Sequence, residues 1–192
     1  MSRQNDIFAT LKQDHDKHRA LLKQIDQTHG ESPERIQLFR AFTLEVKAHA
    51  AAEEQALYST VMRKPKLTSE VRHSVSEHHE IEEMLNDLAA TDMATGAWLT
   101  KFREMQHRYL HHIEEEEDEH FPDFAKCLTE EDQAYMDSVF QQRKPAEKSK
   151  AASTAAPAAR TPPPHPPCDS GRRTSRWSPP DGQEEQRQAS SI

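Results

Sequence analysis

The sequence predicts an all-α fold: an up-down-up-down four-helix bundle with a short fifth helix and a disordered, proline-rich C-terminal tail. Within residues 1–142, apolar residues recur at intervals of three and four, and strand-like alternation is absent. Helix-forming Ala, Leu, Glu, Lys and Gln dominate the same region. Short segments with capping and turn residues separate the periodic runs, so we expect antiparallel helices joined by short connections.

The first helix is expected over residues 6–28, ending near Gly30. Ser32 is a typical N-cap residue and Pro33 suits the first turn of a helix. The second helix is therefore expected over residues 33–62.

The third helix is expected over residues 68–88 and the fourth over residues 95–120, where Pro122 would stop it. The segment from Thr129 to Asp132 reads Thr-Glu-Glu-Asp, a pattern typical of a capping box. It predicts a short fifth helix that ends near Gln141.

The composition changes after residue 142. Residues 143–192 are rich in Pro, Ala and Ser and poor in aliphatic side chains, so they cannot bury enough surface to offset their conformational entropy. We expect a bundle domain over residues 1–142 and a disordered tail over residues 143–192. The bundle holds 16 Lys and Arg against 28 Asp and Glu. This acidic balance argues against a nucleic-acid partner.

Targeting and redox signals are missing from the sequence. No basic-then-apolar leader opens the chain, and no apolar run approaches the roughly 20 residues of a membrane span. Cys127 and Cys168 lie in different regions and form no metal or redox spacing. We expect a cytoplasmic protein without a membrane partner.

Two passages repeat one residue pattern with an offset of 63 positions. Apolar and polar positions stay in register, so the repeat covers core residues and histidines together. The matching pairs are His15 and His78, Leu22 and Leu85, Phe39 and Phe102, Arg40 and Arg103, His49 and His112, Glu53 and Glu116, and Glu54 and Glu117. Such a repeat predicts two halves of one site.

One histidine interrupts the apolar stripe of each long helix. Two of these stripes also carry a glutamate four residues later, and residues at i and i+4 project from the same side of a helix. Burying an ionised carboxylate without a partner is costly unless the group is protonated or shares a cation. The residues that converge in this way are His15, His49, Glu53, His78, His112 and Glu116.

A metal site is the simplest account of this set. The His-x-x-x-Glu spacing alone is weak, since half of the twelve histidines have it, and the alternative is an ordinary bundle with solvated acidic residues. The repeat register and the buried stripe are what favour ligands. Imidazole and carboxylate suit iron, manganese or zinc. Six ligands exceed one tetrahedral zinc site and fit two ions, with each glutamate bridging and each ion keeping two histidines.

Further residues are expected around the centre. Other histidines are expected at the surface or behind the ligands, namely His73, His79, His107, His111 and His120. Glu54 and Glu115 are expected to be solvated or to support the ligands. Candidates for the pocket or for a supporting shell are His18, Glu82, Glu117, Tyr58 and Phe121, with Trp98 and Phe42 as further walls.

The segments DHDKHRALL, HAAAEEQALY, EHHEIEEML and HHIEEEEDEHFP resemble the hemerythrin-like proteins with HHE cation-binding domains. The resemblance covers about Ile7 to Phe124. It implies a four-helix bundle around a non-haem di-iron centre, oxo- or hydroxo-bridged, with roles in oxygen, peroxide, nitric oxide or iron handling. The ligands that it implies are the same six residues, and iron is expected in preference to manganese or zinc.

Two positions depart from the oxygen-carrying hemerythrins. Where they place a second histidine four residues after the third-helix ligand, this chain has Glu82. Where they use an aspartate five residues past the fourth-helix histidine, it has Glu117. The site has one imidazole fewer, which argues against simple oxygen carriage and favours sensing, peroxide turnover or iron binding.

The leading expectation is a metal- and ligand-binding protein that binds or senses a diatomic molecule or peroxide. One alternative is a catalase-like or oxidase-like di-iron enzyme, which needs a proton-transfer group such as His18 or Glu82. Another is a zinc-bound or metal-free helical interaction module. In that case the TPPPHPP segment of the tail could bind a protein partner as a polyproline II ligand.

Overall fold

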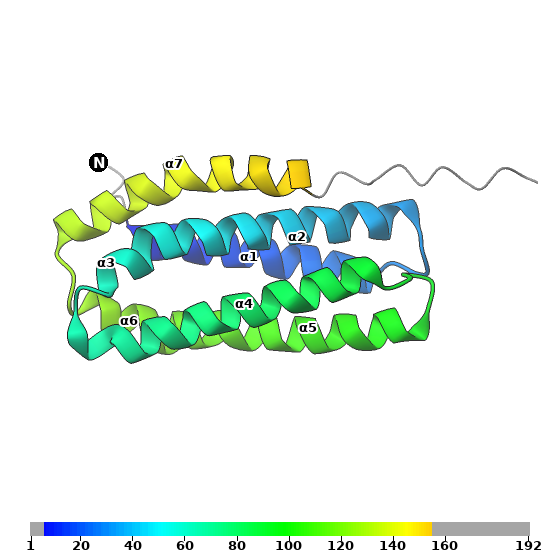
Figure 1. The fold of residues 1–192 in the computed structure, drawn as a ribbon, viewed down its shortest axis with the longest axis horizontal. Helices are drawn as coiled ribbons and strands as arrows, with labels where there is room; N and C mark the ends of the chain where they lie inside the picture. The colour runs from blue at the N-terminus through cyan, green and yellow to red at the C-terminus, as the bar shows by residue number, and fades with distance from the viewer. Residues whose placement is uncertain (1–5, 155–192) are drawn as a thin grey trace, which may run out of the picture. The chain divides into compact units, whose positions relative to one another are not determined.

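The computed structural model describes residues 6–154, and all of its regular elements over that range are helical. Four long helices run antiparallel to their chain neighbours and enclose a common interior (Figure 1). They are α1 (Ile7–Asp26), α2 (Pro33–Glu53), α4 (Thr68–Ala90) and α5 (Gly96–Glu115). The predicted up-down-up-down bundle is confirmed.

Side-chain caps start the helices where the sequence predicts them. Asp6 accepts a hydrogen bond from the backbone N–H of Phe8 at 3.0 Å, and Ser32 accepts one from Arg35 at 3.1 Å. Thr95 begins α5 in the same way. Gly30 has a φ of 57° in the connection before α2, a backbone conformation that favours glycine.

Both helices that carry a predicted ligand pair with His-x-x-x-Glu spacing, α2 and α5, continue through a π-helical turn. α2 leads into η1 (Glu54–Tyr58) and then α3 (Ser59–Val61), while α5 leads into η3 (Glu116–His120). The wider turns change the direction of the side chains that follow, and such π-bulges are frequent at functional sites. A single 3₁₀ turn, η2 (Pro65–Leu67), precedes α4.

The expectation that Pro122 ends the helix at His120 is wrong, because the chain remains helical through α6 (Phe121–Ala125). The N–H of Phe121 already bonds the carbonyl of Glu116, five residues back. Pro122 therefore falls in the first turn of a new α-helical segment, where a missing N–H is tolerated.

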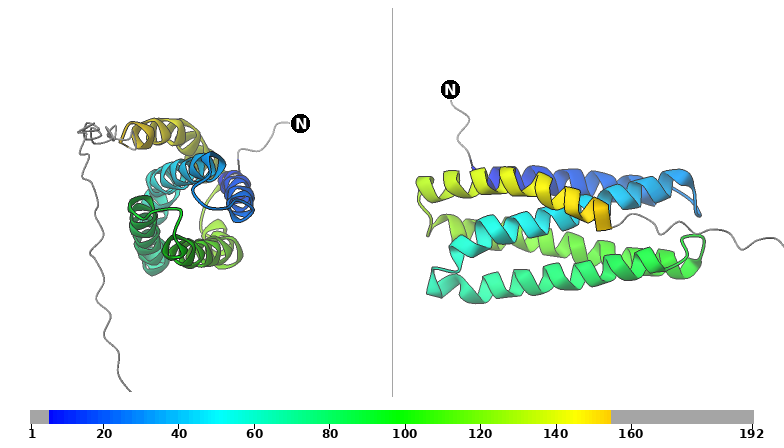
Figure 2. Two further views of the ribbon diagram at one scale, coloured as in Figure 1. Left: turned by 90° about the vertical axis from the view of Figure 1, so that its right-hand side faces the viewer. Right: turned by 45° about the horizontal axis from the view of Figure 1, so that its top comes forward.

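The fifth helix is longer than expected. α7 (Glu130–Thr154) begins at the predicted capping box, where Thr129 and Asp132 bond each other's backbone N–H, but it continues well past Gln141. It lies outside the ring of four helices and packs along α2 (Figure 2). Met136 and Phe140 are buried there, and this packing stabilises a helix that contains Pro145. The rest of the predicted tail lies outside the described residues.

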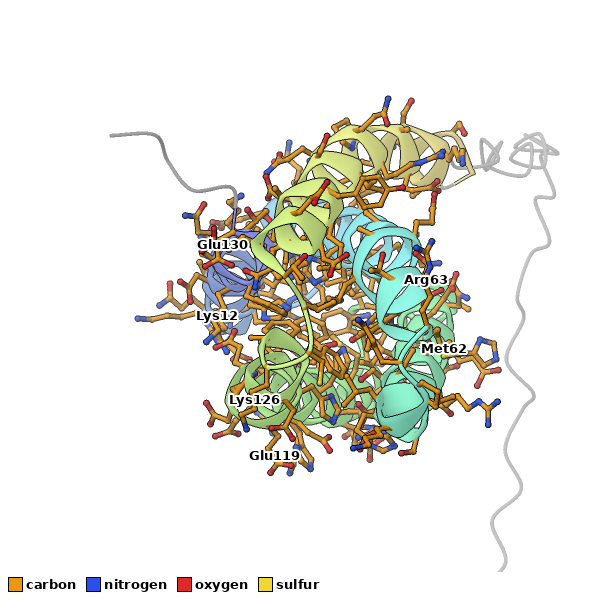
Figure 3. The ribbon with its side chains drawn as sticks, turned by 90° about the vertical axis from the view of Figure 1, so that its left-hand side faces the viewer. Lys12, Met62, Arg63, Glu119, Lys126 and Glu130 are labelled. Atoms are coloured by element: carbon orange, nitrogen blue, oxygen red, sulfur yellow. The ribbon has the colours of Figure 1, made fainter. Side chains whose placement is uncertain are left out.

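The apolar core has two parts. One is built around Leu11, Phe121 and Phe124 near one end of the bundle, and the other around Leu22 and Trp98. Viewed along the bundle, side chains fill the space that the helices enclose, whereas the labelled Glu119 lies at the outer edge (Figure 3). On α1, His15 and His18 separate the residues of the two parts, so a polar layer crosses the middle of the bundle.

None of the helices within residues 6–154 is long and apolar enough to cross a membrane.

Candidate metal centre

The polar layer contains all six predicted ligands. Each is at most 7 % exposed, although histidine and glutamate are rarely buried without a partner. α1 supplies His15, α2 supplies His49 and Glu53, α4 supplies His78, α5 supplies His112, and Glu116 begins η3. Residues from two repeats and four helices thus meet in one place.

The first carboxylate, Glu53, faces two histidines. Its Oε2 lies 3.4 Å from Nε2 of His49 and 3.6 Å from Nε2 of His78. His49 in turn has its Nε2 only 3.1 Å from Nε2 of His15. One side of the layer therefore gathers inward-facing ring nitrogens around a buried carboxylate.

The second carboxylate, Glu116, has the same kind of surroundings. Its oxygens lie 3.5 Å from Nε2 of His15, 3.4 Å from that of His112 and 3.8 Å from that of His78. Atoms that each bind one ion at about 2.1 Å are separated by about 3 Å or slightly more. The distances from the glutamate oxygens to the histidine nitrogens are therefore close to those between donor atoms that bind the same cation.

The outer nitrogen of every predicted ligand histidine faces a carboxylate. The Nδ1-to-oxygen distances are 2.7 Å for His15 and Glu117, 3.4 Å for His49 and Asp14, 3.0 Å for His78 and Glu54, and 2.8 Å for His112 and Glu77. An ionised carboxylate only accepts, so each Nδ1 donates its proton outward. The four Nε2 atoms then present lone pairs to the interior, the arrangement in which imidazole binds a metal.

Two members of this outer shell, Asp14 and Glu77, were missed by the sequence analysis. Their numbers also differ by 63, and each directly precedes a predicted ligand, His15 or His78. The 63-residue offset could therefore have identified these two carboxylates as a matched pair. It did not reveal that each carboxylate reaches across to the histidine of the following long helix.

Unpaired buried atoms test whether the layer suits a cation. Among the described residues, both oxygens of Glu53, one oxygen of Glu116 and Nε2 of His78 are buried without a hydrogen-bond partner. Buried polar atoms are normally paired, and each exception calls for an explanation. Cations bound by these atoms would supply the missing interactions, so the donor set fits metal ions.

The two buried glutamates differ in charge state. Burial alone would raise the pKa of Glu53, but the adjacent His49, whose Nε2 lies 3.4 Å away, outweighs burial and lowers this pKa. Burial raises the pKa of Glu116 well above its ordinary value, and the charge of Glu53 raises it further. Without a cation the pair therefore favours one ionised and one protonated carboxyl group.

Burial lowers the pKa of three histidines in the polar layer. It lowers the pKa of His15 and of His18, and it lowers that of His112 to about 4 despite the hydrogen bond to Glu77. His49 is the exception, since the hydrogen bond with Asp14 and the charge of Glu53 outweigh burial and raise its pKa. Neutral imidazole is the form that binds a metal, and the lowered pKa values favour it at two of the predicted ligands, His15 and His112.

Three predicted neighbours of the centre do lie against it. Tyr58 donates a short hydrogen bond to Glu116, and the ring of Phe121 stacks on His15 at 6.0 Å. His18 is fully buried, with Nδ1 bonded to the hydroxyl of Tyr109 and Nε2 unpaired.

Other predicted positions lie farther out or elsewhere. The side chain of Glu82 is 54 % exposed and pairs with Lys47 at 3.1 Å. Trp98 packs between Phe39 and Phe102 in the apolar core rather than against the ligands. Phe42 contacts the ring of His18, which in turn lies beside the predicted ligands.

Of the five histidines expected at the surface or behind the ligands, four are exposed and one is buried. His73, His79, His107 and His111 are exposed, as a surface position requires. His120 is buried, bonds Ser74 through Nδ1 and has Nε2 3.7 Å from Glu115. A second, partly exposed group with metal-ligand spacing lies beside it, formed by His73, Glu77 and Glu115.

Comparisons with known proteins agree with this geometry. The profile of the Hemerythrin HHE cation binding domain matches residues 6–124. A comparison with curated protein sequences gives no match. A crystal structure of a Hemerythrin HHE cation binding domain-containing protein from Mycobacterium kansasii superposes with a TM-score of 0.68 at 20 % identity, over 78 % of this chain and 91 % of that one. The fold is therefore that of an HHE bundle, and the chain belongs to the hemerythrin HHE cation-binding domain family.

Proposed function

We propose that the protein binds two iron ions at the six-residue layer and that it binds, senses or reacts with oxygen, peroxide or nitric oxide, or handles iron. The supporting observation is that the four predicted ligand histidines are surrounded by a second shell of carboxylates. Every Nδ1 faces a carboxylate of the outer shell, and every Nε2 faces Glu53 or Glu116. Outer-shell carboxylates of this kind orient ligand histidines and raise their basicity.

The ligand chemistry favours iron. Four imidazoles and two carboxylates suit iron or manganese, and a single tetrahedral zinc ion would leave two of the six donors unused. Glu53 and Glu116 each lie near histidines from more than one helix, as bridging carboxylates would. Iron held there would supply electrons or an open coordination position to a small oxidant.

The proposal is tested by loading the full chain with ferrous iron in the absence of oxygen. We expect about two irons per chain, and a visible absorption band that forms in air and shifts when azide is added. Nitric oxide and peroxide are then added separately to identify the oxidant that reacts. Failure to retain iron while the helices remain intact would contradict the proposal and favour a zinc-bound or metal-free module.

One observation favours an enzyme as a second candidate function. His18 and Tyr109 form a buried hydrogen-bonded pair, and the ring centroid of His18 lies 5.2 Å from that of His49. Its unpaired Nε2 is placed to give or take a proton beside the centre. Glu82, the other predicted proton-transfer group, is more exposed.

The enzyme candidate predicts a selective defect. His18→Gln should reduce peroxide turnover by about 100-fold or more while the chain keeps its iron. His107→Gln, a change at an exposed histidine, is the control and should have no effect. Equal turnover by His18→Gln and the parent chain would exclude His18 as the proton-transfer group, and no turnover by the parent chain would leave the protein a binder or sensor.

A further inference from the structure

A cavity of about 370 Å³ lies between α2 and α4 and reaches the metal centre. Its inner end is formed by three of the six predicted ligands, His49, His78 and His112, together with Tyr109. Ligand pockets in proteins measure about 300–1,000 Å³. A diatomic molecule would leave most of this volume empty, since water in the liquid occupies about 30 Å³.

Much of the cavity wall is apolar, while Glu54 and His79 also line it and its mouth is polar. Val46 and Ala50 line it from α2, and Ile81 and Leu85 line it from α4. At the mouth, Lys47 crosses between the two helices and bonds Glu82 at 3.1 Å and Asn86 at 2.8 Å. The cavity therefore offers a hydrocarbon-lined passage with polar groups at both ends.

The internal repeat shows where the space comes from. In the other half of the bundle, Ile113 stands where Ala50 lines the cavity, and Tyr109 stands at the position of Val46. Ile113 and Tyr109 are only 1 % and 2 % exposed. Smaller side chains at two matched positions thus leave room between α2 and α4.

The matching face between α1 and α5 is closed. The side chains of His18 and Tyr109 bond each other across it, and Arg19 pairs with Glu117 at 3.0 Å on its outer side. A cavity on that face is lined by Arg19, Leu110, Glu114, Glu117 and Asp118, and by none of the six predicted ligands. The two halves share one ligand pattern but differ in access.

We propose that this cavity binds a small organic hydroperoxide, with its hydrocarbon body between α2 and α4 and its peroxide group toward His49, His78 and His112. The proposal rests on the proposed reaction with oxidants and specifies the substrate class. Among those oxidants, an organic hydroperoxide has both a polar peroxide group and an apolar body. The peroxide group suits the histidine end of the cavity, and the apolar body suits the walls formed by Val46, Ile81 and Leu85. Apolar walls with a few convergent polar groups are typical of small-molecule sites.

Ala50→Ile is the most direct test, because it copies into the open half the side chain that Ile113 provides in the closed half. Ala41→Ile is the matched control: it makes the same change on α2 at another half-buried alanine that does not line the cavity. Both full-length variants should retain the parent's helix content and iron content.

The first measurement uses the metal-free full chain and 2-phenyl-2-propanol, the unreactive alcohol of cumene hydroperoxide. Calorimetric titration should show binding to the parent and to Ala41→Ile, and binding at least about tenfold weaker to Ala50→Ile. No binding by the parent, or equal binding by all three chains, would overturn the proposal. This readout does not depend on iron.

The second measurement follows one oxidation of the ferrous-loaded chain, in which two ferrous ions and two protons reduce a hydroperoxide to an alcohol and water. Ala50→Ile should slow the reaction with cumene hydroperoxide and leave that with hydrogen peroxide unchanged. Equal effects on both peroxides would refute the cavity as the site of the organic body. If the parent reacts with neither peroxide, the peroxide reaction within the proposed function fails, and the alcohol titration still decides whether the cavity binds an organic molecule.

Discussion

Asp14 and Glu77 make the same contact in the two halves of the bundle. Asp14 Oδ2 lies 3.4 Å from Nδ1 of His49, and Glu77 Oε2 lies 2.8 Å from Nδ1 of His112. Both carboxylates are nearly fully buried, and each also pairs with a cation, Lys144 or Arg108. The internal repeat thus extends from the predicted ligands to the groups that orient them.

Removal of Glu77 tests this outer shell. Glu77→Ala should weaken iron binding about 10–100-fold, because Nδ1 of His112 loses the acceptor that fixes its tautomer and orientation. Equilibrium dialysis of iron against a competing chelator measures the change. Glu80→Ala is the control, since Glu80 pairs with the same Arg108 but does not contact His112. Equal affinities for both variants would show that the contact does not support the site.

α7 should be part of the stable domain. The side chain of Phe140 is 1 % exposed, and its ring centroid lies 5.6 Å from that of His49. Phe140→Ala should lower the free energy of unfolding by about 3–5 kcal/mol through the cavity that it creates. Tyr135→Ala, at a side chain that is 60 % exposed, should change it little. Urea unfolding compares the variants, and an unchanged midpoint for Phe140→Ala would exclude α7 from the cooperative core.

The buried carboxyl group of Glu116 should cost stability when no metal is bound. Glu116→Gln removes a group whose pKa is raised by burial and by the charge of Glu53, so the metal-free variant should be at least as stable as the parent. The parent should gain about 2.7 kcal/mol per site when free iron is at 100 times its Kd, and the variant should lose most of that gain.

Thermal unfolding with iron and with a chelator measures both effects. Glu119→Gln is the control, because Glu119 belongs to the same π-helical turn but lies at the outer edge (Figure 3). A parent chain whose melting temperature is the same with and without iron would contradict the account.

The metal-free protein should lose stability as the pH falls from about 6.5 to about 4. Burial lowers the folded-state pKa of His112 to about 4, so below 6.5 the unfolded chain binds a proton that the folded chain does not. The stability that this histidine contributes is complete above pH 6.5 and disappears through pH 4, a change of roughly 3 kcal/mol. The lowered pKa values of His15 and His18 act in the same direction, whereas the raised pKa of His49 opposes them.

Urea unfolding at pH 7 and pH 5 measures this slope. His112→Gln should reduce it, and His107→Gln should leave it unchanged because His107 is exposed. A metal-free chain equally stable at both pH values would contradict the burial of neutral histidines.

The bundle and the six residues at its centre could be predicted because both follow from periodicity. The helical spacing of apolar residues places one histidine per helix on a buried stripe, and the 63-residue offset selects His15 and His49 from twelve histidines. Helix starts were predictable for a similar reason, since the Ser32 cap acts through local contacts alone.

Features that depend on tertiary contacts could not be predicted. The extent of α7 follows from Phe140 in the core and from Lys144, which pairs with Asp14 on another helix. Local composition, with Pro145 in the segment, predicts no helix there. The continuation of the helix past Pro122 likewise depends on the π-helical turn before it.

The most direct test of the central claim is the crystal structure of the iron-loaded full chain, with anomalous scattering measured at the iron edge. The account predicts two peaks per chain about 3.5–4 Å apart, enclosed by Nε2 of the four histidines and the carboxylates of Glu53 and Glu116. A single peak, or iron bound only by His73, Glu77 and Glu115 at the second group, would contradict it.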